Sequence, residues 1–420
     1  MSARRAPGAR TMANGGSSRG SAVTQQLDGD LRQPPRVGAS VVGRQHGRMQ
    51  LPVQPFEIHV EELVLEDLYR RLRTARWPDR SPGSPWSQGT DLDYLRALVD
   101  FWLDGFDWRR EESRLNGYAQ FVAEVDGVRV HYVHQQSGKP PLVLTHGWPS
   151  SFAEMLPLVD RLSDDFDLVV PSLPGYAFSS RPAHVGVDRT YTARLWHLLM
   201  QGLGYSTYGA CGGDFGAGVA TSMALSEPAR MTGIHLSTPE VTPYLGPGSA
   251  PLSPDEQAYL DHVAQWDETE RGYSAIQSTR PQTLGYALND SPVGLAAWLV
   301  EKWRAWSDSG GDVDAHIGRD NLLTTITLYW VTGSITSSMR DYVDNRWHGS
   351  SIGVDDRVRV PTAMSVFANE FVPEGEPPRS LFERLYDIRR WTVFSRGGHF
   401  AATEEPDLLA ADIKAHFVGG

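Results

Sequence analysis

The sequence predicts a protein of the α/β class, with a mostly parallel central sheet flanked by helices, an inserted helical lid and a helical N-terminal extension. Between residues 119 and 239, short apolar runs that suit buried strands alternate with stretches of helical period. The alternation breaks over 240–355, where helices bounded by Pro and Gly carry many aromatic residues, and it resumes over 356–420. The segment 51–118, which precedes the first strands, is helical in pattern. We therefore expect a core formed by 119–239 and 356–420, a lid formed by 240–355 and an N-terminal domain formed by 51–118.

The N-terminal domain is expected to hold three helices. The first spans 64–77, where apolar residues recur at three- and four-residue spacing on one face, and Pro78 is expected to end it. The other two are expected near 91–102 and 108–115.

The core is expected to begin with a hairpin, because Asp126-Gly127 joins two runs of strand pattern at 121–125 and 128–133. Short apolar runs predict further strands at 142–145, 168–171, 206–211, 234–237, 362–367 and 391–394. Helical patterns lie between them near 152–162 and 193–203 and from 219 to the stop at Glu227-Pro228, and a further one follows the last strand near 407–417. Strands that alternate with helices in this way form parallel sheets that are covered on both faces.

Charge is distributed unevenly along the 420 residues. The first 50 carry eight arginines against two aspartates, a net charge of +6, so the remainder carries −18. We expect 1–50 to be a disordered leader rich in Gly, Ser and Arg, because it holds too few apolar residues to pack. The acidic body excludes a nucleic-acid partner, which requires clustered positive charge.

Two other features of the sequence bear on location. No apolar run approaches the ~20 residues of a membrane span, so no membrane anchor is expected. Cys211 is the single cysteine, which excludes an intramolecular disulfide and favours the reducing cytoplasm. Its position in an apolar strand indicates a small core residue instead of a reactive thiol.

The strongest functional signal is the segment Gly212-Gly213-Asp214-Phe215-Gly216, which lies between a predicted strand and a predicted helix. Small residues two places either side of a reactive side chain, in a strand–turn–helix connection, form the nucleophile elbow of the α/β-hydrolase fold. Serine is usual at the tip of that elbow, and this chain carries Asp214 there. A carboxylate nucleophile forms an alkyl ester with its substrate, which narrows the chemistry chiefly to epoxides and alkyl halides.

An aspartyl ester persists unless a base activates water beside it, and the base needs an acid to orient it. His399 follows the last predicted strand in a glycine-rich loop, where it can return over the elbow. Glu370 follows the strand 362–367 and completes the order nucleophile, acid, histidine. Glu240, at the end of the preceding strand, is the competing acid. Glu404 and Glu405 are expected to be solvated or to lie at the N-terminal end of the last helix.

The turn after the strand 142–145 is the candidate oxyanion hole. It can direct the Trp148 backbone N–H, together with that of Phe215, toward the ester carbonyl. The G-x-S-x-G match at 349–353 is interpreted as chance, because no strand precedes it and no helix follows. His131 and His134 are not expected to share a metal, because a three-residue offset on a strand points them to opposite faces. No metal and no cofactor are therefore predicted.

With these residues in place, the chain resembles the microsomal-type epoxide hydrolases over about residues 52–418. The elbow and the glycine-rich loop of His399 are similar to those of that family, as are the turn His146-Gly147-Trp148-Pro149 and the loop Pro174-Gly175-Tyr176. The N-terminal segment carries the family's motifs Leu68-Tyr69-Arg70-Arg71-Leu72, Arg76-Trp77-Pro78-Asp79, Asp107-Trp108-Arg109 and Arg114-Leu115-Asn116. Any one of these motifs is shared across hydrolases, but the N-terminal motifs together with an aspartate elbow are specific.

The resemblance implies roles for particular residues. It makes Asp214 the nucleophile, His399 the base and Glu370 the charge-stabilising acid. It also implies two lid tyrosines that hold the epoxide oxygen, which map onto Tyr273 and Tyr342; the residues alone would not single these out among 15 tyrosines. The residue after the nucleophile is commonly Trp in the family and is Phe215 here, which keeps the backbone donor and changes the pocket wall. Animal members begin with a membrane anchor, whereas this leader is polar.

The expected function is hydrolysis of a small hydrophobic epoxide by water, which gives a vicinal diol. Two alternatives stay open at this point. A dehalogenase would use the same aspartate but would need N–H donors for the leaving halide, and a binding protein on this fold would carry the residues without turnover. A homodimer is also left open.

Overall fold

The computed structural model describes residues 51–180, 182–238, 241–370 and 377–419. The predicted disordered leader, 1–50, lies outside these ranges, as does Glu240. Everything described below belongs to one compact unit of the chain.

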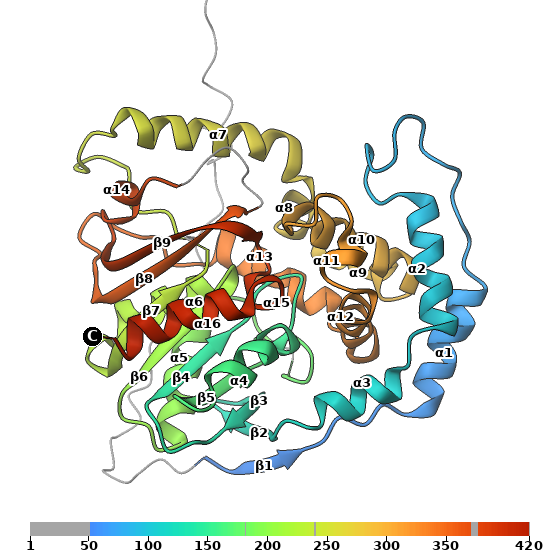
Figure 1. Cartoon of the computed structure of the whole chain (residues 1–420), viewed down its shortest axis with the longest axis horizontal. Helices are drawn as coiled ribbons and strands as arrows, with labels where there is room; N and C mark the ends of the chain where they lie inside the picture. Colours follow the sequence, from blue (N-terminus) through green and yellow to red (C-terminus); the bar gives the residue numbers. More distant parts are fainter. Residues whose placement is uncertain (1–50, 181, 239–240, 371–376, 420) are drawn as a thin grey trace, which may run out of the picture. The chain divides into compact units, whose positions relative to one another are not determined.

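The described residues form one sheet of nine strands in the order β1-β2-β3-β5-β4-β6-β7-β8-β9 (Figure 1). The strands are β1 Val53–Phe56, β2 Gln120–Val125, β3 Val128–Gln135, β4 Pro141–Thr145, β5 Asp167–Pro171, β6 Tyr208–Gly212, β7 Met231–Leu236, β8 Val358–Asn369 and β9 Tyr386–Gly398. The first three strands pair in antiparallel fashion, as do β3 and β5, and every pair from β5 to β9 is parallel. The mostly parallel sheet of the α/β-hydrolase fold is thereby confirmed.

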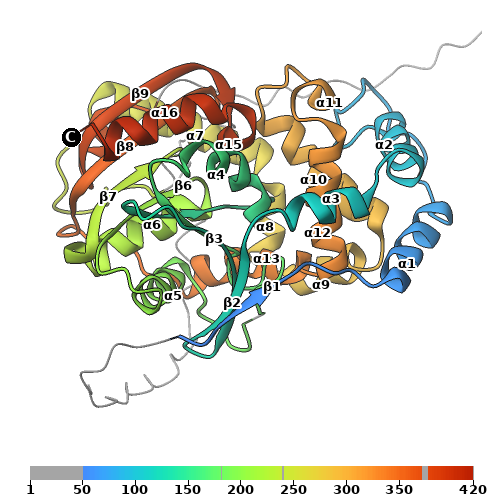
Figure 2. The same cartoon turned by 60° about the horizontal axis from the view of Figure 1, so that its bottom comes forward.

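The central strands are buried on both sides, which is why they read as continuous apolar runs. Helices α5 (Arg189–Gly202) and α6 (Phe215–Ser226) cover one face of the sheet. Helices α4 (Leu156–Leu162) and α16 (Pro406–Phe417) cover the other (Figure 2). Short helical turns complete the core, namely η1 Phe152–Met155, η2 Pro228–Arg230, α14 Arg379–Phe382 and α15 Ala401–Glu404. The carboxyl ends of β6 and β8 therefore open toward the loops that carry the candidate site.

The N-terminal segment differs from its prediction at two points. It begins with strand β1, which pairs with β2 at the sheet edge, where Pro55 is tolerated because an edge strand has N–H positions that need no partner. Helix α1 (Glu62–Arg73) ends at Arg73, well before Pro78. The chain leaves helical geometry at Thr74, and Trp77 then lies under the guanidinium of Arg96, 5.2 Å from the ring centre. Helices α2 (Leu92–Asp104) and α3 (Trp108–Leu115) lie where they were expected.

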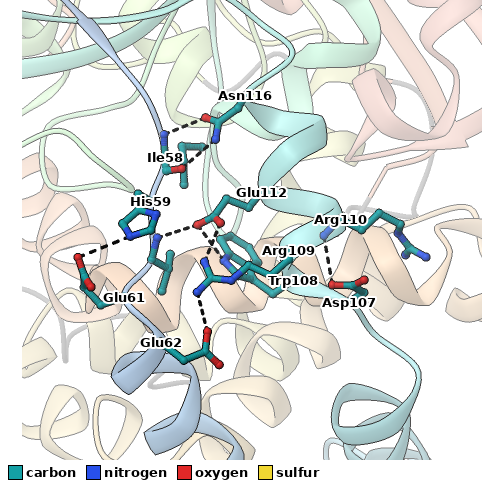
Figure 3. Close-up of polar contacts among 11 residues, drawn as sticks. Ile58, His59, Glu61, Glu62, Asp107, Trp108, Arg109, Arg110, Glu112 and Asn116 are labelled. Carbon is teal, nitrogen blue, oxygen red and sulfur yellow. Dashed lines mark hydrogen bonds and ion pairs between the residues drawn. The ribbon is translucent and has the colours of Figure 1, made fainter.

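Polar contacts hold the extended segment before α1 against helix α3 (Figure 3). The side chain of Asn116 pairs twice with the backbone of Ile58, accepting its N–H and donating to its carbonyl oxygen at 2.8 Å each. Glu112 accepts the Val60 N–H at 2.7 Å and also binds Arg109 at 2.7 Å. The motifs around 107–109 and 114–116 thus have a structural role, because they fix the N-terminal segment on the body.

Replacing Asn116 with Ala is expected to lower the free energy of unfolding by about 1–3 kcal/mol, because the buried backbone groups of Ile58 lose both partners. Urea denaturation monitored by circular dichroism measures this change. His59→Ala, on the same segment but exposed, is the matched control and should stay within about 0.5 kcal/mol of wild type. Equal stability of the two variants would contradict the assigned role of Asn116.

Seven helices lie between β7 and β8 in the described sequence: α7 Pro254–Glu270, α8 Gly272–Gln277, α9 Pro281–Leu288, α10 Pro292–Trp306, α11 Val313–His316, α12 Arg319–Thr332 and α13 Ile335–Trp347. The N-terminal helices α1 and α2 lie beside α10, and α3 lies beside α12 (Figure 1). The indole N–H of Trp102 on α2 also donates to the Thr327 hydroxyl on α12, at 3.1 Å. The domain boundaries drawn from the sequence stay predictions. No helix in the described ranges is both long and apolar enough to cross a bilayer.

Candidate active site

The elbow between β6 and α6 has the geometry that the sequence predicts. Asp214 stands at its tip with φ +49° and ψ −129°, a backbone conformation that costs energy in any residue other than glycine. The turn closes because a Cβ at Gly216 would overlap the carbonyl oxygen of Thr145 on β4. Such strain, held by tight packing on both sides, fixes the direction of the Asp214 side chain.

The two carboxylate oxygens of Asp214 lie in different surroundings. Oδ1 accepts the backbone N–H groups of Trp148 at 2.9 Å and Phe215 at 2.7 Å, the pair predicted as the oxyanion hole. Oδ2 faces Nε2 of His399 at 3.5 Å. The loop that carries Trp148 comes this close because Gly147 has no Cβ, which would overlap the Asp214 side chain. One oxygen is therefore held by two donors and the other faces the candidate base.

The His399 imidazole is almost fully buried, and it lies between the two carboxylates. Its Nδ1–H donates to Oε1 of Glu370 at 2.6 Å, while Glu370 Oε2 accepts the Thr238 hydroxyl at 3.3 Å. Burial lowers the pKa of His399, but the charges and hydrogen bonds of Glu370 and Asp214 outweigh it, so the pKa stands well above its usual value. Glu370 is thus the acid that contacts the histidine, whereas the competing Glu240 lies outside the described residues.

The two lid tyrosines lie over the elbow, on helices α8 and α13. The ring of Tyr273 stacks on the Trp148 indole with centres 5.5 Å apart, and the ring of Tyr342 meets the same indole edge-on at 5.7 Å. The two phenol rings are 5.9 Å apart. Phe215 packs edge-on against Tyr342 at 5.0 Å. The structure therefore brings together every residue that the sequence and the resemblance proposed for the site.

One further acid lies at the site, and sequence reasoning missed it. Glu154 lines the cavity against Asp214 and His399, and burial raises the pKa of its carboxyl to about 7. The available signal was its position in the first helical turn after the predicted oxyanion loop. A carboxyl group that gains a proton near neutral pH can hydrogen-bond water in this cavity as donor or acceptor.

The features that the sequence analysis set aside have structural explanations. Burial lowers the pKa of His131 to about 3, and its ring contacts Ser172 and Gln120 at 2.9 Å each. His134 contacts the Tyr205 hydroxyl at 2.9 Å. Among the described residues no group of His, Cys, Asp and Glu is arranged to hold a metal ion. Cys211 is buried in β6, and that burial raises the pKa of its thiol.

The chain matches two protein-family models and several known proteins. The family model described as "Epoxide hydrolase N terminus" matches residues 53–155, and the model described as "alpha/beta hydrolase fold" matches 140–284. A protein from Stigmatella aurantiaca assigned to the epoxide hydrolases is 40% identical over 87% of this chain and 84% of its own length. Epoxide hydrolase 1 of Sus scrofa is 33% identical over 86% of this chain and 88% of its own.

A solved structure agrees with the sequence relatives. The crystal structure of juvenile hormone epoxide hydrolase from the silkworm Bombyx mori has a TM-score of 0.80 at 28% identity, and the match covers 88% of this chain and 95% of that one. The sequence relatives and this solved structure each match more than four fifths of the chain. The chain belongs to the epoxide hydrolase family.

Proposed function

We propose that the protein converts an epoxide into a vicinal diol through a covalent ester on Asp214. The observation that carries the proposal is the unequal pairing of the Asp214 oxygens. Oδ1 is held by the Trp148 and Phe215 amides, and Oδ2 lies free of them on the side of His399. In that arrangement Oδ2 can attack the epoxide carbon, and Oδ1 can carry the negative charge when the ester is hydrolysed.

In the first half of the reaction, Asp214 Oδ2 forms a bond to an epoxide carbon as the carbon–oxygen bond of the ring breaks. The electron pair of that bond leaves on the ring oxygen, which takes a proton from the hydroxyl of Tyr273 or Tyr342. Both rings lie over the elbow, and a phenolic donor lowers the barrier to forming an alkoxide. The products of this half are a hydroxyalkyl ester and one tyrosinate.

In the second half, His399 Nε2 takes a proton from water, and the resulting hydroxide adds to the ester carbonyl carbon. The negative charge moves onto Oδ1, where the amides of Trp148 and Phe215 are already in place; each such donor typically lowers a barrier by ~3 kcal/mol. The intermediate expels the diol oxygen, which takes the remaining proton of the added hydroxide, and the Asp214 carboxylate is regenerated. The proton held by His399 returns to the tyrosinate, so the net reaction consumes one water.

Ester formation also lowers the pKa of His399, so that the imidazole can be neutral when it takes a proton from water. The charge of Asp214 raises the pKa of His399 in the free enzyme, and the neutral ester removes that charge. We expect ester hydrolysis to rise with pH to a plateau, with a midpoint below the pKa of His399 in the free enzyme. Stopped-flow rates between about pH 5 and 8, where proteins tend to be most stable, give the midpoint, and NMR titration gives the free-enzyme pKa. Identical values would contradict this account.

The substrate is proposed to be a hydrophobic epoxide, because aromatic rings wall the site above Asp214. Assays of diol formation from styrene oxide and from larger aryl epoxides test both the reaction and the preference. Faster turnover of the larger substrates is expected. Absence of diol from the whole series, with folded protein, would defeat the proposal. The cytoplasmic location and the homodimer stay predictions.

One observation keeps a dehalogenase as the second candidate. The indole Nε1–H of Trp148 is buried and has no hydrogen-bond partner among the described residues, and a leaving halide needs such N–H donors. Halide release from haloalkanes, measured beside diol formation from epoxides, separates the two activities. Release of halide without any diol would favour this second candidate.

A further inference from the structure

Of the two placements expected for Glu404, the structure agrees with the second: it lies two residues before the last helix, α16, and it is not solvated, because its side chain is fully buried. Its Oε2 accepts the backbone N–H groups of Asp308 at 2.7 Å and Gly398 at 3.1 Å, and its Oε1 accepts that of Phe400 at 2.9 Å. Nε2 of His316 lies 3.0 Å from Oε2. Four groups thus converge on one carboxylate, which is why a charged side chain is retained inside the protein.

These contacts belong to a larger arrangement around the base. Each of the four backbone N–H groups of residues 397–400 has an acceptor, two of them on the buried carboxylate just described. Of the other two, the N–H of Gly397 donates to Asp308 Oδ2 at 2.9 Å, and that of His399 donates to the carbonyl oxygen of Trp306 at 2.8 Å. Asp308 and Trp306 lie at the end of lid helix α10. The loop of the base is therefore held between Glu404 and the lid.

The approach between loop and lid is close. A Cβ at Gly398 would lie 2.6 Å from the Trp306 carbonyl oxygen, so glycine is required there. The Trp306 indole meets the His399 ring edge-on at 5.2 Å, and Trp303 stacks on Phe400 at 3.7 Å. A change in the lid end or in Glu404 must therefore be transmitted to the imidazole.

We infer that Glu404 is a positioning residue for ester hydrolysis: by binding the lid end and both neighbours of His399, it holds the imidazole where it can deprotonate the attacking water. The inference rests on the proposed function. It assigns Glu404 to the second half of the reaction, ester hydrolysis, because ring opening by Asp214 needs no proton transfer to His399. Small displacements of a base reduce its rate steeply, since proton transfer requires hydrogen-bond distance.

The test is single-turnover kinetics of Glu404→Gln, with ester formation and ester hydrolysis followed as separate phases. A glutamine oxygen can keep the acceptor position toward Asp308 and Gly398, but its NH₂ group then faces the Phe400 N–H and that bond is lost. We expect ester formation within about twofold of wild type and ester hydrolysis at least about tenfold slower, so that the ester accumulates. Intact-protein mass spectrometry detects the accumulated ester.

Two further variants make the test specific. Glu405→Gln is the matched control, because this neighbouring carboxylate pairs with the exposed Arg396, and both phases should be unchanged. Asp308→Ala removes the lid carboxylate that accepts the Gly397 N–H. This variant should slow ester hydrolysis and leave ester formation unchanged. Unchanged hydrolysis in folded Glu404→Gln, or equal slowing of both phases, would overturn the inference. Failure of the wild-type enzyme to form any ester would instead overturn the proposed function.

Discussion

Asp214→Ala is expected to abolish turnover, with a loss of about 10⁵-fold or more, because no other group in the elbow can bond to substrate carbon. The amides of Trp148 and Phe215 keep their positions but lose the oxygen that they hold. Diol formation under excess epoxide, followed over hours, measures the loss. The variant should remain folded, because the alanine side chain is smaller than that of aspartate and adds no steric overlap at this strained position.

The control for this variant is Asp104→Ala, which removes an exposed carboxylate at the end of α2 and should leave turnover unchanged. Thermal unfolding of both variants confirms that they are folded. Residual activity of folded Asp214→Ala above about a hundredth of wild type would show that another group performs the attack.

His399→Gln is expected to separate the two halves of the reaction. Asp214 still attacks the epoxide, but no base activates water, so hydrolysis slows by about 10²–10⁴-fold and the ester accumulates. Intact-protein mass spectrometry should show a mass increase equal to that of the epoxide, and peptide mapping should place it on Asp214. The trapped ester is the species that the proposed mechanism requires.

His348→Gln, an exposed histidine after α13, is the control and should turn over without a detectable adduct. A His399→Gln enzyme that neither turns over nor gains mass would mean that the histidine acts before the ester forms. That result would remove the assigned role of His399 as the base for water.

Local sequence signals were enough to predict which residues meet at the candidate site. Glycines around Asp214 mark a turn that only small neighbours permit, and the glycine-rich loop of His399 follows a strand whose carboxyl end faces the elbow. Parallel strands bring such loops to one edge of the sheet, so residues far apart in sequence could be placed together from their order alone. Glu370 was chosen over Glu240 by this order, and it is the acid that contacts His399.

Contacts between distant segments were not predictable in the same way. The edge strand β1, four residues that are mostly exposed and include Pro55, becomes a strand only through its pairing with β2. Glu404 reads as a surface acid because its four partners come from the lid and from the loop of the base. Tyr273 and Tyr342 resembled thirteen other tyrosines until the resemblance marked them.

The most direct test of the covalent mechanism is a single turnover in ¹⁸O-labelled water with enzyme in excess over epoxide. The ester route transfers an oxygen of the Asp214 carboxylate to the product, so the diol of the first turnover should carry no label and the label should appear in the peptide that contains Asp214. A labelled diol from the first turnover would mean that water attacks the epoxide directly, and it would contradict the account.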